Sequence, residues 1–150
     1  MRVLAHVHSI PSYEELVPNK IGLGELIERL GQLDKRKRVV GFISLTFDLP
    51  RLDEEEKQRL LDDIVGKLTR IREPAYMEKY VKVNPHDSIF KEVEVVYTDG
   101  TSVKVSVGEW RGECFTLVKI EFASVPVENI TSILREIVEK VIPIITLYKI

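Results

Sequence analysis

The sequence predicts a single α+β domain, with a mainly antiparallel sheet and three helices packed mostly on one face of it. Residues 91–122 alternate apolar and polar side chains in three successive runs. Three other stretches carry apolar residues at a spacing of three and four, which is typical of amphipathic helices. No repeat or linker-like tract divides the 150 residues, so we expect one domain over residues 1–150.

The region 91–122 is expected to form a three-stranded meander. Asp99-Gly100 separates its first two runs, and this dipeptide favours a tight hairpin because both residues accept a positive φ at low cost. The connection between the second and third runs contains Trp110 and Arg111. Both residue types are common at the centres of protein interfaces, so we treat them as candidate interaction residues, although Trp110 could equally fold back over the sheet.

The first 49 residues are predicted to contain two strands and one helix. Arg2–His8 alternates as a strand does, and Val39–Leu49 is rich in β-branched and aromatic residues, as expected of a central strand. Residues 9–20 contain two prolines and are expected to form a loop with one helical turn at 13–17. The first helix is expected from Leu23 to about Asp34.

A second helix is predicted after Asp53, which forms a capping-box pair with Glu56 three residues later. Its apolar stripe continues to Ile71, and Pro74 closes it. Residues 76–83 are expected to form a further strand.

The third helix is predicted over 127–141, with Pro143 as its end. The tail that follows is apolar and rich in β-branched residues, so we expect it to add a strand or to contact another subunit. Its candidate interaction residues are Ile144, Ile145, Leu147 and Tyr148.

The composition of the chain limits the classes of partner and the cellular compartment that we expect. The 22 basic and 24 acidic residues leave a formal charge of -2, so no global field draws the protein to nucleic acid or to an anionic membrane. No signal-like segment or membrane span is present, and the one cysteine, Cys114, is expected to be a small buried residue in a strand. We therefore expect a cytoplasmic protein. The high charged fraction resembles that of thermophile proteins.

A metal site is one alternative. His6 and His8 are two residues apart on a predicted strand, so they share a face and could chelate a divalent metal, with His86 as a third ligand. The segment HVHS resembles the opening strand motif of the polymerase-and-histidinol-phosphatase family of metal phosphoesterases, over four residues. This resemblance implies a metal-dependent hydrolase whose ligands are His and acidic residues along a barrel.

Nucleic-acid binding is a second alternative. Lys35, Arg36, Lys37 and Arg38 form the densest cationic run and could contact phosphates. The same run lies between a predicted helix and strand, where cations commonly cap carbonyl groups.

No catalytic or cofactor motif stands out from the sequence. Glu92 and Glu94 share a strand face that we expect to be solvated. Our first expectation is therefore a protein that acts by binding, as a protein-interaction or ligand-binding module rather than an enzyme. A homo-oligomer is the first partner considered and another protein the second, because the C-terminal region is more apolar than a small monomer usually exposes.

Overall fold

The computed structural model describes only part of the chain. The main chain is described for residues 2–9, 13–17, 39–83, 89–98, 100–110, 113–126, 134–137 and 139–148, and side chains for most of these from Ser44 onward. Several predictions lie outside the described residues: the helix at 23–34, the basic run at 35–38, His86 and Arg111.

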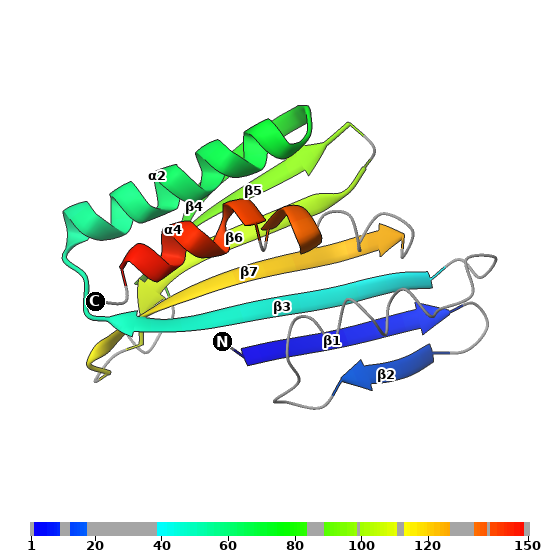
Figure 1. Ribbon diagram of the computed structural model, residues 1–150, viewed down its shortest axis with the longest axis horizontal. Helices are drawn as coiled ribbons and strands as arrows, with labels where there is room; N and C mark the ends of the chain where they lie inside the picture. The colour runs from blue at the N-terminus through cyan, green and yellow to red at the C-terminus, as the bar shows by residue number, and fades with distance from the viewer. Residues whose placement is uncertain are drawn as a thin grey trace.

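The main element is a seven-stranded sheet in the order β2-β1-β3-β7-β6-β5-β4, with every neighbouring pair antiparallel (Figure 1). The α+β class with an antiparallel sheet is therefore confirmed. The strands are β1 Arg2–Ser9, β2 Tyr13–Val17, β3 Val39–Pro50, β4 Pro74–Val83, β5 Ile89–Tyr97, β6 Ser102–Glu109 and β7 Phe115–Pro126.

The chain order explains this arrangement. After β3 in the middle of the sheet, α2 (Glu54–Ile71) carries the chain to β4 at one edge, and the meander β5-β6-β7 returns it to β3. The predicted meander is confirmed, and its first turn contains Gly100 with a φ of 89°. Glycine adopts this left-handed conformation without the steric penalty that a side chain would bring.

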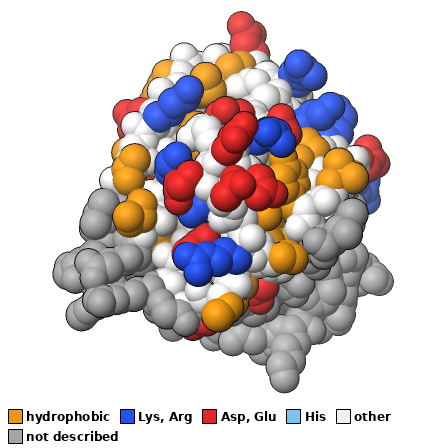
Figure 2. Space-filling model, turned by 90° about the vertical axis from the view of Figure 1, so that its left-hand side faces the viewer, with side chains coloured by type: hydrophobic (Ala, Val, Ile, Leu, Met, Phe, Trp, Pro, Cys, Tyr) orange, Lys and Arg blue, Asp and Glu red, His pale blue; other side chains and the backbone are white. Residues whose placement is uncertain are grey.

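Helix α2 begins as its sequence predicts. The Asp53 carboxylate accepts a hydrogen bond from the Glu56 main-chain N–H at 2.7 Å, and the Glu56 carboxylate accepts one from the Asp53 N–H at 3.3 Å. The first turn is acidic, which complements the positive end of the helix dipole. Acidic and basic side chains gather at the middle of this end of the molecule, with hydrophobic ones to either side (Figure 2).

Replacing Asp53 with alanine is expected to lower the free energy of unfolding by about 1 kcal/mol, because the Glu56 N–H loses its partner. Urea denaturation followed by circular dichroism measures this change. Asp62→Ala is the matched control: Asp62 accepts one exposed hydrogen bond from Gln58, so its loss should cost less than about 0.5 kcal/mol. Equal losses in the two variants would contradict the capping role.

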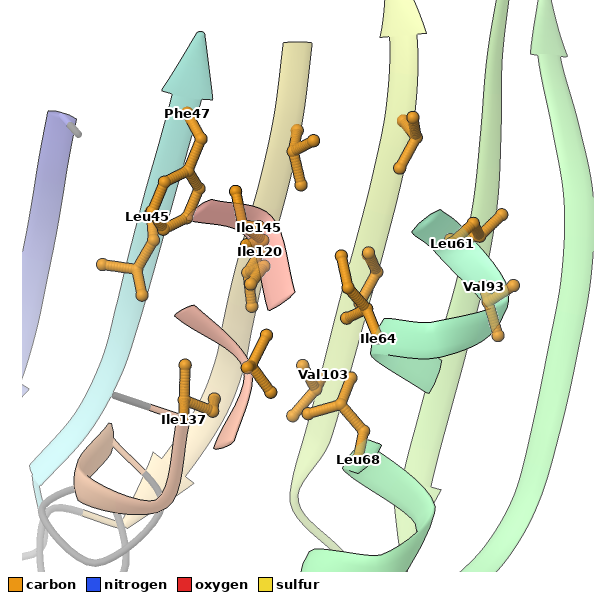
Figure 3. Close-up of a cluster of buried hydrophobic side chains, with 14 of the residues drawn as sticks. Leu45, Phe47, Leu61, Ile64, Leu68, Val93, Val103, Ile120, Ile137 and Ile145 are labelled. Atoms are coloured by element: carbon orange, nitrogen blue, oxygen red, sulfur yellow. The ribbon is translucent and has the colours of Figure 1, made fainter. Parts of the chain in front are cut away.

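The core lies between one face of the sheet and the helices (Figure 3). Alternate residues of four strands point toward α2 and the C-terminal helical residues, and each is almost wholly buried. The strand residues are Leu45, Phe47 and Leu49 from β3, Val93, Val95 and Tyr97 from β5, Val103, Val105 and Val107 from β6, and Val118, Ile120 and Phe122 from β7. Helix α2 contributes Leu60, Leu61, Ile64 and Leu68 to the same core.

The C-terminal tail is helical, so its prediction as a strand is wrong. Residues 134–137 and 139–140 are helical, and α4 follows as Ile142–Leu147. Pro143 lies in the first turn of α4, where its missing N–H breaks no hydrogen bond, so it begins a helix instead of only ending one. The structure gives both ends of two helices, α2 and α4, so the predicted number of three is not confirmed.

The tail also buries most of its apolar surface within its own chain. Leu134, Ile137, Val141 and Ile145 are fully buried, and Ile144 and Tyr148 pack against the same core. Of the described tail residues, only Leu147 stands out as an exposed large hydrophobic, at 72%. Among the described C-terminal residues, the expected excess of exposed apolar surface is therefore limited to the Leu147 side chain.

Residues 13–17 form strand β2, so the helical turn predicted there is wrong. The segment pairs antiparallel with β1, and β1 pairs on its other side with β3. Five residues with two adjacent glutamates carry little strand signal of their own, so the pairing with β1 decides the conformation.

Two single-residue expectations are also corrected. Cys114 is exposed, because it lies in the bend that precedes β7 and not within a strand. Glu92 is buried, with 6% exposure, and one of its carboxylate oxygens accepts a hydrogen bond from the Ser106 hydroxyl of the neighbouring strand at 3.0 Å. No helix among the described residues is both long and apolar enough to cross a membrane.

Candidate functional site

Three of the predicted interaction residues lie together on one groove. Ile144, Leu147 and Tyr148 line it from α4, and residues of α2 and of the β3–α2 connection form the remaining wall. The groove is open to solvent and has a volume of about 460 Å³. The lining from the rest of the chain is Pro50, Arg51, Leu52, Glu56, Arg59 and Asp63. The fourth predicted tail residue, Ile145, is buried and takes no part.

Charges of both signs surround the apolar part of this groove. The side chains of Arg51 and Arg59 are 69% and 60% exposed, and their guanidinium groups lie 3.6 Å from Glu109 and 3.4 Å from Glu55. Tyr148 also lines the groove, and burial of its phenol together with the carboxylate of Asp63 raises its pKa. Tyr148 therefore stays neutral at physiological pH and can present both a ring face and a hydroxyl to a ligand.

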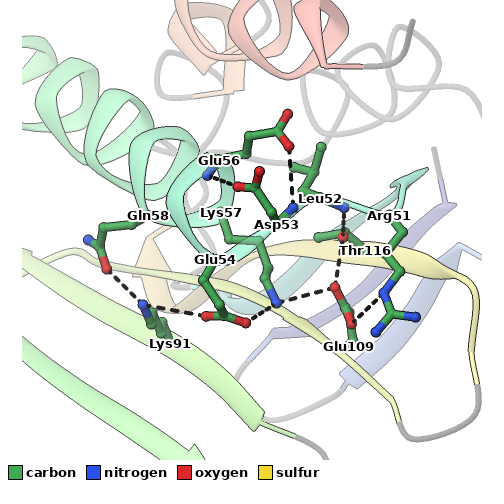
Figure 4. A network of polar contacts seen from close by, with 10 residues as sticks. All are labelled: Arg51, Leu52, Asp53, Glu54, Glu56, Lys57, Gln58, Lys91, Glu109 and Thr116. Atoms are coloured by element: carbon green, nitrogen blue, oxygen red, sulfur yellow. Dashed lines mark hydrogen bonds and ion pairs between the residues drawn. The ribbon is translucent and has the colours of Figure 1, made fainter.

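A polar network lies beside the groove and joins α2 to three strands (Figure 4). The Lys57 ammonium contacts Glu54 at 2.6 Å and Glu109 at 3.2 Å. Glu109, at the end of β6, also accepts a hydrogen bond from the Thr116 hydroxyl at 3.2 Å, and Arg51 lies 3.6 Å from its second oxygen. Lys91 on β5 extends the network to Glu54 and Gln58.

Lys57 and Glu109 form the least exposed ion pair of the network, with side-chain exposures of 12% and 18%. Burial acts to lower the pKa of Lys57, but the hydrogen bonds with Glu54 and Glu109 outweigh it, so this pKa is raised. The Thr116 hydroxyl that bonds Glu109 also accepts a hydrogen bond from the Leu52 N–H at 2.9 Å. The network thus fixes the start of α2 on the sheet, and with it one wall of the groove.

The raised pKa of Lys57 predicts a loss of stability at high pH. A lysine whose pKa is higher in the folded state stabilises that state fully below its unfolded value of 10.5, and this contribution disappears as the pH rises through the folded pKa. Lys57→Met removes the effect and is expected to cost about 1–2 kcal/mol at pH 8, between the values for exposed and buried pairs.

The measurement is the free energy of unfolding of wild type and Lys57→Met at pH 8, 10 and 11.5. The difference between the two proteins should shrink above pH 10.5. A difference that stays constant across this range would show that Lys57 contributes through packing alone.

Trp110 lies apart from the tail residues, against β5. Its ring meets Phe90 edge to face, with ring centroids 5.3 Å apart, and it remains 44% exposed. This agrees with a tryptophan that folds back on the sheet. Phe90 in turn covers Gly108 on β6, where an added Cβ would lie 2.6 Å from the ring.

His6 and His8 lie in strand β1, where their main chain pairs with Phe42 and Val40 of β3. β1 is an inner strand, with β2 on its other side. Among the residues whose side chains are described there is no group of three or more potential metal ligands. The side chains of His6 and His8 and the whole of His86 lie outside the described residues, so the metal site stays a prediction.

Sequence reasoning missed Lys57, Glu109, Arg59 and Asp63. Lys57 and Glu109 are 52 positions apart along the chain (109 minus 57), and no local pattern joins them. Arg59 and Asp63 lie four residues apart on α2, so a shared exposed face was readable, but the groove depends on where α4 packs.

Comparisons with known proteins leave the family open. No protein-family model and no curated protein sequence matches the chain. A solved structure with partial similarity is the open form of the exocytosis-sensitive phosphoprotein pp63/parafusin, a phosphoglucomutase, from Paramecium. It is 18% identical with a TM-score of 0.39, and the match covers 69% of this chain and 19% of that one. This chain therefore spans about a fifth of that protein's length, and the likeness carries no argument about function.

Proposed function

We propose that this protein is a protein-interaction module that binds a short segment of another protein in the groove between α2 and α4. The observation that carries the proposal is Leu147, which is 72% exposed on the groove while Ile145 on the same helix is fully buried. When a partner side chain covers an exposed leucine, the burial of apolar surface stabilises the complex.

The lining indicates what kind of segment fits. Ile144, Leu147 and Tyr148 provide an apolar wall for one large aliphatic or aromatic side chain. The accessible Arg51 and Arg59 favour a carboxylate next to that anchor. A segment with a large apolar residue flanked by an acidic one therefore complements this groove better than a purely apolar segment does.

Selection from a random peptide library on the full-length protein tests the proposal. We expect enriched peptides to share a large apolar residue beside Asp or Glu. Leu147→Asp should weaken the binding of such a peptide by about tenfold or more. The new carboxylate would replace the apolar contact of the anchor and repel the acidic residue beside it.

Thr146→Asp is the matched control. Thr146 precedes Leu147 on α4, is exposed, and does not line the groove, so the same new charge there should change affinity by less than about threefold. Peptides that bind wild type and Leu147→Asp equally would place the binding surface elsewhere. Failure to enrich any peptide sequence would argue against a peptide-binding groove.

A further inference from the structure

Strand β4 forms one edge of the sheet and exposes an unusual number of hydrophobic side chains. It is the last strand in the sheet order and pairs on one side with β5. Seven large hydrophobic side chains are exposed among the described residues, and four of them lie on β4, each with 36–59% exposure: Tyr76, Met77, Tyr80 and Val81. A long edge strand with exposed apolar side chains can act as a template for pairing with another strand, although Glu78, Lys79 and Lys82 also lie on β4.

The opposite edge lacks these properties. β2 has five residues, against ten in β4, and two of the five are the glutamates Glu14 and Glu15. Short, charged edge strands resist pairing with other chains. Edge pairing, if the protein uses it, is therefore expected at β4.

We propose that β4 pairs antiparallel with β4 of a second copy, so that two sheets join into one across a twofold axis. This surface is separate from the groove and does not depend on what the groove binds. A twofold axis that relates two antiparallel strands must stand perpendicular to the sheet, which keeps the helices of both copies on the same side. Residues that face each other across the axis therefore share a sheet face, and their numbers differ by an even number.

Charge then selects the register. An axis at Glu78 or at Lys79 would place that residue opposite its own copy, and directly opposed like charges are destabilising. An axis at Tyr80 instead places Glu78 opposite Lys82 of the second copy, and the symmetry repeats this pair. In the same register Met77 lies opposite Val83 of the second copy.

The pairing within one chain supports this register. Glu78 lies opposite Glu94 of β5, so two carboxylates already face each other on that side of the sheet. In this register the second copy brings position 82, a lysine, opposite Glu78 on its free side. Within the chain Glu94 also lies opposite Lys104 of β6, whereas on the free side of Glu78 the second copy supplies the opposite charge.

The surroundings leave room for such a contact. Helix α2 packs against β6 and β5, and the described residues place the sheet order so that β4 lies outside that pair (Figure 1). Two such helices on the joined sheet would lie roughly 19 Å apart, about four strand spacings, which exceeds a helix diameter. On the other face the Lys104 ammonium lies 5.9 Å from the centre of the Tyr80 ring, so it holds this ring toward β6 and away from the axis.

Charge reversal with sedimentation velocity over a range of concentrations tests the proposal. Wild type is expected to sediment as a concentration-dependent dimer. Glu78→Lys or Lys82→Glu should each raise the dimer dissociation constant by about tenfold or more, and the double variant should restore it to within about threefold. Glu78→Lys places a cation opposite Glu94 of β5, so this variant should fold at least as well as wild type. Loss of the dimer in this variant would therefore not be due to loss of folding.

Leu147→Asp is the control that distinguishes this surface from the groove, and it should leave the dimer intact. A wild-type monomer at high concentration would overturn the proposal. A dimer that survives both single reversals, or one that Leu147→Asp abolishes, would overturn it as well, since the contact would then lie outside β4.

Discussion

Gly108→Ala is expected to lower the free energy of unfolding by about 3 kcal/mol or more, the largest effect we predict for a single added methyl group. Gly108 lies on β6 directly beneath the Phe90 ring. A Cβ there would lie 2.6 Å from one ring carbon and closer still to the main-chain oxygen of Ile89. The ring could rotate, but the oxygen belongs to the strand pairing of β5 with β6 and can move only if that pairing shifts.

Gly66→Ala provides the matched control with the opposite sign. Gly66 lies within α2, and a Cβ there would meet nothing within 4 Å. Alanine in a helix interior is favoured over glycine by about 0.5–1 kcal/mol, so this variant should be more stable than wild type. Guanidinium denaturation of both variants is the measurement. A loss below about 1 kcal/mol for Gly108→Ala would mean that β5 and β6 do not approach as closely as described.

Ile145→Ala is expected to cost about 2–4 kcal/mol, because a fully buried side chain in the shared core would be replaced by a cavity. Leu147→Ala, two residues later on α4, should cost less than about 0.5 kcal/mol because its side chain is already in water. Thermal and chemical denaturation of both variants measures the difference. Equal costs would mean that α4 does not pack on the core by this face.

Local signals in the sequence predicted much of the fold. Asp99-Gly100 identified the hairpin between β5 and β6 because the turn depends on a positive φ that few residues accept. Asp53 and Glu56 identified the start of α2 because both halves of the capping box lie within four residues. In each case the residues that decide the structure are close together in the chain.

The wrong predictions have the opposite character. Residues 13–17 are a strand because β1 lies beside them, and Glu92 is buried because Ser106 and its neighbours cover it. The tail is helical because Ile145 finds a core already built by α2 and the sheet. Long-range packing overrides local propensity at these positions, and no window of the sequence contains both partners.

The sequence did not predict the groove itself, only some of the residues that line it. Ile144, Leu147 and Tyr148 were recognisable as candidate interaction residues because they are apolar residues near a chain end. The cations and carboxylates beside them come from α2 and the end of β3, more than eighty positions earlier (144 minus 63 is 81). Their meeting depends on the sheet order.

The position of β3 has a consequence for synthesis of the protein. Leu45 of β3 pairs with Ile120 of β7, 75 residues later (120 minus 45). A nascent chain therefore carries one side of β3 without its partner strand while everything from α2 to β6 leaves the ribosome. Delayed long-range pairing slows folding and leaves the unpaired N–H and C=O groups of the strand edge free to pair with other chains. Chaperone dependence of this protein is accordingly expected to concentrate in the interval before β7 emerges.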